Sequence, residues 1–204
     1  MAKPNVNVAP VRKGTNIITG CVRLAYNSVL EPKVSDLSDD KTPKYPAVLL
    51  IEPNDPVIGL MKEAMLQAAN EFFGEGKVPK GLRSPLRDGS EKEAEYPFYA
   101  GHKFISVTTK NKPGVVDQRN KPITDPDDIY SGCWVRAEIN CFAYDRKGNK
   151  GVSFGLNNMQ KLGDDERFGG RRPAEQVFSP VVDAANPFDK GAATDAGEDE
   201  DMFA

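Results

Sequence analysis

The chain has 204 residues, 39% of them hydrophobic, with 18 glycines, 16 prolines and a net charge of −3. This length and apolar content suit one folded domain, and the frequent glycines and prolines favour short strands joined by loops over a helical bundle. No apolar run approaches the ~20 residues needed to cross a bilayer, and the first residues lack the apolar stretch of a secretion signal. We therefore expect a cytoplasmic protein of mainly β class with minor α.

Ligands for metals and groups for catalysis are scarce in this sequence. There is a single histidine and no Cys-x-x-Cys pair among the three cysteines, Cys21, Cys133 and Cys141. The sequence therefore predicts reduced, buried cysteines, no zinc site and no cofactor. We expect no enzyme, because Walker, Gly-x-Ser-x-Gly and His-Glu-x-x-His motifs are absent. Acidic clusters at 125–128 and 164–166 could bind magnesium for a nuclease, but their surroundings favour turns and helix starts.

The first elements predicted along the chain are an arm and a strand. Residues 1–15 are polar and form the predicted N-terminal arm. From Ile18 to Asn27 apolar and polar residues alternate, which predicts a half-buried strand. Its alternation places Tyr26 on the core face and Arg23 on the outward face.

The next segment changes from strand to helix. A short apolar run at 45–51 predicts a second strand. Asp55 can cap a helix, Pro56 suits its first position, and apolar residues then recur at helical spacing until Gly74. A charged, glycine-rich loop follows at 75–95.

The second half of the chain predicts three more strands. Residues 99–109 alternate again, a loop fills 110–128, and a hairpin joins strands at 133–145 and 152–162. Five strands, one capping helix and long loops predict a five-stranded OB-fold barrel, which we place at 16–182.

The strand at 133–145 carries the sharpest local pattern. One parity is wholly apolar and must face the core: Cys133, Val135, Ala137, Ile139, Cys141 and Ala143. The opposite parity interleaves aromatic rings with an arginine: Trp134, Arg136, Phe142 and Tyr144. Exposed rings are costly unless something stacks on them, and nucleobases do so at about 1–3 kcal/mol each. We hypothesise that this face binds a single strand, although rings lying under the long loops or in a dimer contact explain the pattern equally well.

Basic side chains could follow the phosphates of such a strand. Residues 1–182 carry a net charge of +3, which suits a polyanionic ligand. The candidates for contacts to DNA are Arg23, Lys103, Lys110, Lys112, Arg146, Lys147 and Lys150. Phe154 shares its parity with Val152 and Leu156 and is expected in the core.

The C-terminal tail at 183–204 contrasts with this body. It holds seven acidic residues and one lysine, a net charge of −6, and predicts disorder. A tethered acidic segment can compete with nucleic acid for a basic groove, although a merely solubilising end explains the charge as well. At its tip, acids precede an apolar pair, which is similar to the partner-binding tail tips of single-stranded-DNA-binding proteins: Asp199, Glu200, Asp201, Met202 and Phe203.

Three stretches resemble a known family. They are Tyr-Ala-Gly-His-Lys-Phe-Ile at 99–105, Tyr-Ser-Gly-Cys-Trp-Val-Arg-Ala at 130–137 and Gly-Val-Ser-Phe-Gly-Leu-Asn-Asn at 151–158. Together they resemble the single-stranded-DNA-binding proteins of tailed phages, a family once known only as a domain of unknown function, and the resemblance runs from about residue 20 to 178. It implies an OB-fold, sequence-tolerant binding of single strands, no cofactor, a role in phage DNA replication and recombination in the host cytoplasm, and often a dimer.

The leading hypothesis is a protein that coats and protects single-stranded DNA. Its tail would recruit phage or host replication proteins such as a polymerase, helicase or primase. The alternative is a phage structural or assembly protein that makes only protein contacts.

Overall fold

The computed structural model describes residues 3–34 and 41–169. The predicted boundary at 183, the acidic tail and its tip at 199–203 lie outside the described residues. Within the described part, no helix is long and apolar enough to cross a membrane.

The described residues form nine strands, one α-helix and three short 3-10 helices. The first strands are β1 (Val11–Lys13), β2 (Asn16–Ile18), β3 (Val22–Ala25) and β4 (Tyr45–Ile51), and the helix α1 (Val57–Phe73) follows them. The later strands are β5 (Arg87–Asp88), β6 (Lys103–Thr109), β7 (Gly114–Val116), β8 (Trp134–Arg146) and β9 (Asn149–Gly163). The 3-10 helices are Gly89–Glu91, Pro97–Tyr99 and Pro126–Asp128.

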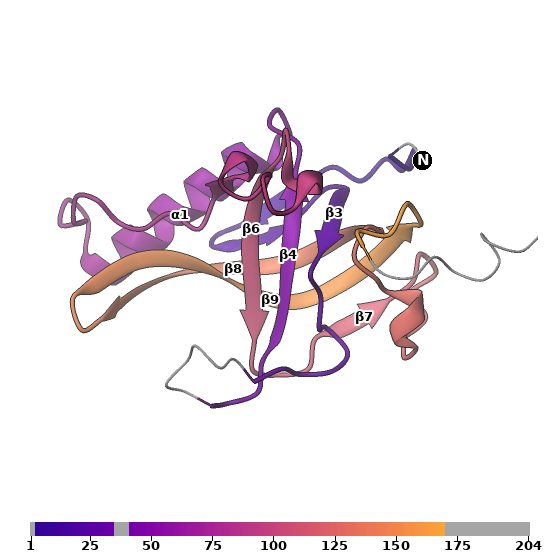
Figure 1. Cartoon of the computed structure of the whole chain (residues 1–204). Helices are drawn as coiled ribbons and strands as arrows, with labels where there is room; N and C mark the ends of the chain where they lie inside the picture. Colours follow the sequence, from indigo (N-terminus) through magenta and orange to yellow (C-terminus); the bar gives the residue numbers. More distant parts are fainter. Residues whose placement is uncertain (1–2, 35–40, 170–204) are drawn as a thin grey trace, which may run out of the picture. The chain divides into compact units, whose positions relative to one another are not determined.

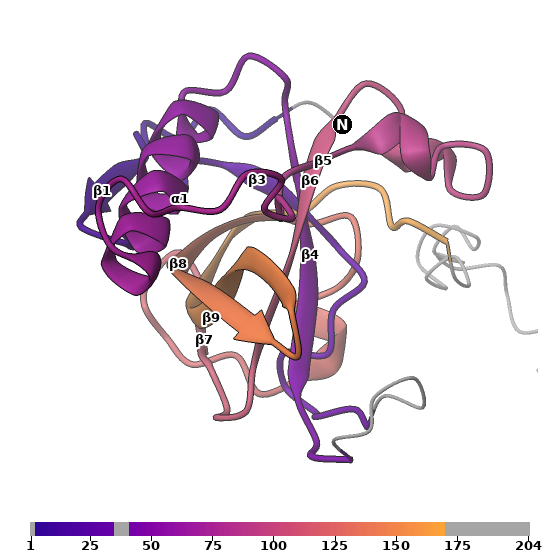
Figure 2. The same ribbon diagram turned by 90° about the vertical axis from the view of Figure 1, so that its left-hand side faces the viewer.

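The pairings of five of these strands close a barrel, which can be followed in Figures 1 and 2. β3 pairs with β4, β4 with β6, β9 with β8, and β8 again with β3, all antiparallel, while β6 and β9 pair in parallel. This cyclic pairing confirms the predicted five-stranded OB-fold and the mainly β class. The remaining strands widen the sheet: β2 joins β8, β1 joins β2, β5 joins β6 and β7 joins β9.

The helix α1 covers one side of the barrel and contacts β8, with smaller contacts to β1, β2 and β9. Its apolar stripe includes Val57, Met61 and Ala64, all buried. The start of the helix agrees with the prediction, because the Asp55 carboxylate accepts a hydrogen bond from the backbone N–H of Val57 at 2.9 Å. Its end agrees as well, because the helix stops at Gly74, whose φ is 91°. The predicted capping helix is therefore confirmed.

The first predicted strand, Ile18–Asn27, is wrong in extent and partly in facing. The structure has two strands instead, β2 and β3, and the inward parity changes between them: Ile17 and Val22 both lie in the core. Thr19 causes the change, because its backbone N–H donates to the Ala137 carbonyl while its hydroxyl accepts the Ala137 N–H, each at 2.9 Å. A side-chain hydrogen bond thus replaces one step of the ladder. Between Ile18 and Val22 the chain has one residue more than β8 has between Glu138 and Val135, which shifts the alternation by one position.

Tyr26 was expected in the core and lies outside it. β3 ends at Ala25, and Tyr26 has a positive φ of 42°, which ends the strand alternation. Its ring is 44% exposed on the outer surface of the barrel.

The hairpin of β8 and β9 agrees closely with the sequence pattern. The predicted core parity of β8 is buried throughout, and so is Phe154 of β9. The connection is tighter than predicted: Lys147 and Gly148, with φ of 51° and 83°, form a two-residue turn.

Candidate nucleic-acid interface

A groove of about 490 Å³ crosses the outer surface of β4 and β6. On β6, Ile105 and Val107 enter the core, so Ser106 and Thr108 of the opposite parity face outward. The groove extends from the residues just after β3 to the outer face of β9, and its lining includes Tyr26, Lys33, Val48, Ser106, Thr108 and Ser153. Small hydroxyl side chains thus lie among apolar lining residues such as Val48, and Lys33 adds a cation.

Aromatic side chains gather at one end of this groove, in a group that we call the aromatic cluster: Tyr26, Tyr96, Phe98, Tyr99, Phe104 and Phe168. They pack on the outer side of β4 and β6, beside Leu50 and Val48. Tyr99 and Phe104 are fully buried, whereas the rings of Tyr26, Tyr96, Phe98 and Phe168 retain exposure. The cluster and the groove share Tyr26, and Val48, which lines the groove, packs beside the cluster, so the two form one continuous surface.

Cations surround the aromatic cluster. Arg87 lies 4.9 Å from the Phe104 ring centroid, Lys92 lies 5.8 Å from that of Tyr99, and Arg23 lies 4.4 Å from that of Phe168. Cations at these distances are attracted to the ring faces.

The phenols of Tyr96 and Tyr99 stay protonated. A side-chain hydrogen bond to Glu95, followed by one to Tyr26, raises the pKa of Tyr96. Burial raises the pKa of Tyr99 to about 12. At neutral pH these rings therefore add no negative charge that would repel a phosphate chain.

Phe142 lies beside the groove on its β8 side. It is 41% exposed and pairs across the hairpin with Ser153, which lines the groove. Tyr144, two residues further on, is half-buried over Gly151, where a Cβ atom would come within 2.6 Å of the Tyr144 hydroxyl. The structure thus places Phe142 on the outer face, as predicted, with Tyr144 turned down onto the hairpin.

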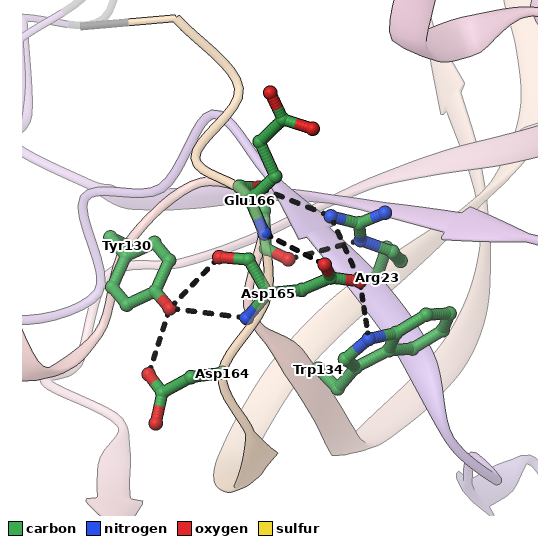
Figure 3. Close-up of polar contacts among 7 residues, drawn as sticks. Arg23, Tyr130, Trp134, Asp164, Asp165 and Glu166 are labelled. Carbon is green, nitrogen blue, oxygen red and sulfur yellow. Dashed lines mark hydrogen bonds and ion pairs between the residues drawn. The ribbon is translucent and has the colours of Figure 1, made fainter. Parts of the chain in front are cut away.

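Trp134 was predicted on the same exposed face and is instead buried, with 6% of its surface accessible. The parity was correct, but the predicted arm folds back over the ring: Val6 and Val8 pack against its cluster and the Lys3 ammonium lies 5.9 Å from its centroid. The indole N–H donates to the Asp165 carboxylate at 2.9 Å (Figure 3). Its expected exposure was therefore wrong.

Asp165 is the centre of a buried polar network (Figure 3). Its carboxylate accepts the Trp134 and Glu166 N–H groups and lies 3.4 Å from the Arg23 guanidinium. Burial alone would raise the pKa of Asp165, but the hydrogen bonds to its carboxylate, among them those from Glu166 and Trp134, act with the Arg23 charge to lower it. The side chain is therefore ionised at neutral pH, although it is almost inaccessible to solvent.

Arg23 is bound to the protein on several sides. Its Nε donates to the Gly132 carbonyl at 3.0 Å and an Nη donates to the Glu166 carbonyl at 3.1 Å. Its guanidinium also lies 5.0 Å from the Trp134 centroid. Arg23 thus faces outward as predicted, with its guanidinium fixed beside Phe168 of the aromatic cluster.

The remaining predicted cations are spread over four places. Arg136 donates to Gln160 at 2.7 Å and lines a different hollow with Ile18 and Val116. Lys103 forms an ion pair with Asp88 at 3.2 Å, where β5 pairs with the start of β6. The others are exposed, either after the end of β6 or at the β8–β9 turn: Lys110, Lys112, Arg146, Lys147 and Lys150.

Sequence reasoning missed most of the aromatic cluster. Tyr96, Phe98 and Phe168 lie in loops or short 3-10 segments, where no period indicates which way a side chain points. A usable signal was the aromatic run at 96–99 in an otherwise charged loop. Lys33, in the long loop before β4, gave no signal of its own.

The closed OB barrel, its outer groove and the adjoining aromatic and cationic side chains define a protein of the single-strand-binding class. The family model described as Enterobacter phage Enc34, ssDNA-binding protein, matches residues 15–189. Protein p50 of Acyrthosiphon pisum secondary endosymbiont phage 1 is 34% identical over 159 residues, which cover 73% of this chain and 84% of that protein. The chain belongs to the Enc34 family of single-stranded-DNA-binding proteins, as the resemblance predicted.

Solved structures agree with the fold. The single-stranded-DNA-binding protein of bacteriophage Enc34, in complex with ssDNA, aligns with a TM-score of 0.68 and 22% identity, covering 80% of this chain and 99% of that one. The bacteriophage T7 single-stranded-DNA-binding protein gp2.5 aligns with a TM-score of 0.55 and 15% identity, covering 88% and 98% of the two chains. At these identities the likeness concerns the fold.

Proposed function

We propose that the chain binds single-stranded DNA along the outer groove of β4 and β6, with bases stacked on the aromatic cluster, in phage DNA replication and recombination. The observation that carries this proposal is the continuity of the groove and the cluster through Tyr26 and Val48. OB-folds bind oligonucleotides on the face of their second and third strands, which here are β4 and β6.

The side chains of the groove favour binding that tolerates any sequence. Ring faces stack on every base, and the groove offers hydroxyls such as those of Ser106 and Thr108 rather than a fork that reads one base edge. Lys33 and the exposed lysines after β6 supply cations for phosphates. Binding should therefore depend strongly on salt and weakly on base identity.

The test compares two exposed aromatic rings. Tyr26→Ala removes a ring that lines the groove, whereas Phe72→Ala removes a ring on α1 that is 54% exposed and lies outside both the groove and the cluster. Affinity for fluorescein-labelled oligothymidylate, measured by anisotropy, should fall by about 1–3 kcal/mol for Tyr26→Ala and stay unchanged for Phe72→Ala. Equal affinities of the two variants would place the binding surface elsewhere.

We further propose that the tail recruits replication proteins and competes with DNA for the groove. The support is its charge of −6 and the sequence of its tip, Asp199 to Phe203. A chain ending at residue 182 should bind single strands more tightly at low salt, and salt should reduce the gain. Phe203→Ala should abolish pull-down of a replicative polymerase, helicase or primase at unchanged DNA affinity. Unchanged low-salt affinity of the truncated chain would leave only the recruiting role.

A further inference from the structure

We propose that the face of Phe98 is a base-stacking position and that the side chain of Phe168 occupies it in the free protein. This inference rests on the groove and cluster proposed above and assigns one subsite within them. Phe168 would be exchanged for a base when a strand binds.

The geometry of the Phe98 and Phe168 pair motivates this assignment. Their ring planes differ by 3° and their centroids are 4.4 Å apart. The other rings around Phe98 are inclined to it, Tyr99 by 28°, Tyr96 by 40° and Tyr26 by 50°. A nearly parallel ring at this separation is placed as a nucleobase is placed when it stacks on an aromatic side chain.

A fixed cation completes the position. The Arg23 guanidinium lies 4.4 Å from the centroid of Phe168, and the Asp165 carboxylate and two backbone carbonyls hold it there (Figure 3). Because these interactions involve no atom of Phe168, Arg23 would keep its place when that ring leaves. A base that replaced Phe168 would meet the Phe98 face and a preorganised guanidinium.

The side chain of Phe168 can leave without unfolding the segment that carries it. Upstream, the Tyr130 hydroxyl binds Asp164 and the carbonyl of Asp165, and the Arg167 guanidinium lies 4.0 Å from the Tyr130 centroid. The Phe168 N–H donates to the Ser131 carbonyl at 2.9 Å. These interactions hold the backbone, so a change of side-chain rotamer is enough to uncover Phe98.

The packing beneath Phe98 is not optimised for folding alone. The Tyr99 hydroxyl is buried and has no hydrogen-bond partner among the described residues. Buried polar groups are normally paired, and an unpaired one destabilises the arrangement that encloses it. The packing around Phe98, with this unpaired hydroxyl beneath it, is therefore suited to rearrange when DNA binds.

The decisive experiment uses the whole chain and labelled oligothymidylate. Phe168→Ala should tighten binding about 2- to 10-fold, because an aromatic interaction of about 0.5–1.5 kcal/mol no longer competes with the base. Phe98→Ala should weaken binding. In the double variant the gain from Phe168→Ala should vanish, because the position itself is missing. Phe72→Ala, outside the cluster, serves as the control.

Each outcome decides the proposal. Weaker or unchanged binding by Phe168→Ala overturns it, and weaker binding would make Phe168 part of the platform. Phe168→Leu, which keeps apolar packing without a ring, should shift affinity in the same direction and covers the case in which the alanine variant fails to fold. If Tyr26→Ala and Phe98→Ala both leave affinity unchanged, the groove proposal fails; if they weaken binding and Phe168→Ala does not tighten it, only this inference fails.

Discussion

The two ends of β8 carry the same kind of residue on the same parity and have opposite surroundings. At the start of the strand, Trp134 is 6% exposed, covered by the N-terminal residues and hydrogen-bonded to Asp165. Near its end, Phe142 is 41% exposed beside the groove. Strand parity decides which face a ring takes, and a segment far away in the sequence decides whether solvent or DNA can reach it. Variants at the two ends of the strand test that contrast.

The largest effect is expected for the stability of Trp134→Ala. Removing a buried indole leaves a cavity and takes one hydrogen bond from the Asp165 carboxylate, so the free energy of unfolding should fall by about 3–5 kcal/mol. Urea unfolding followed by circular dichroism measures it, with Phe72→Ala as an exposed-ring control. A decrease below about 0.5 kcal/mol, the range of ordinary surface changes, would show that the arm does not cover the ring in solution.

The opposite behaviour is expected at the other end of the strand. Phe142→Ala should leave the free energy of unfolding nearly unchanged and weaken binding of oligothymidylate by about 1–3 kcal/mol, with little dependence on the base. Anisotropy titrations with homopolymers of thymine, cytosine and adenine test both parts. A large decrease in stability at full affinity would reverse the contrast with Trp134.

Because Asp165 is ionised, the stability that it adds around Trp134 should depend on pH. Because its pKa is lowered in the folded state, its carboxylate stabilises the fold above the unfolded pKa of about 3.9, and that stabilisation is lost as the pH falls through the folded pKa. Asp165→Asn should lower the free energy of unfolding by about 1–3 kcal/mol at pH 7. The difference in this free energy between the variant and the parent chain should shrink below about pH 4. Urea unfolding of both proteins across this pH range measures the difference, and a constant one would mean that Asp165 is not ionised.

Charge reversal at the β8–β9 turn tests the exposed end of β8 and should have a smaller effect on DNA binding. Replacing Arg146, Lys147 and Lys150 by glutamate should lower affinity, and each phosphate that is no longer neutralised should reduce the slope of log affinity against log salt by about 0.7. Lys150 already pairs with Asp145 at 3.4 Å, so its share should be the smallest of the three. An unchanged slope would show that the strand does not reach this turn.

The smallest effect is expected in the fluorescence of Trp134, the only tryptophan. Its ring is covered, so oligothymidylate should change its emission only slightly, through Arg23, which lies between Trp134 and Phe168. Titrations at low and high salt measure the response. Strong quenching would indicate that bases stack directly on the indole and that the N-terminal residues move away.

Periodic segments of the chain were predictable because burial repeats with the geometry of the element. The core parity of β8, the helix from Val57 to Phe73 and the outward position of Phe142 follow from periods of two and 3.6 residues. The prediction failed where a local hydrogen bond breaks the period, as at Thr19, or where the backbone takes a positive φ, as at Tyr26.

The sequence by itself determined the barrel, its capping helix and the family, because alternation, capping residues and the stretches near 99, 130 and 151 are local properties of the chain. Only the tertiary structure decided which rings meet. Residues as distant as Tyr26, Phe98 and Phe168 join one cluster, and Val6 reaches Trp134, because loops and strand ends carry no period that reports their direction. The physical reason is that exposure depends on what packs over a face, and that segment lies elsewhere in the chain.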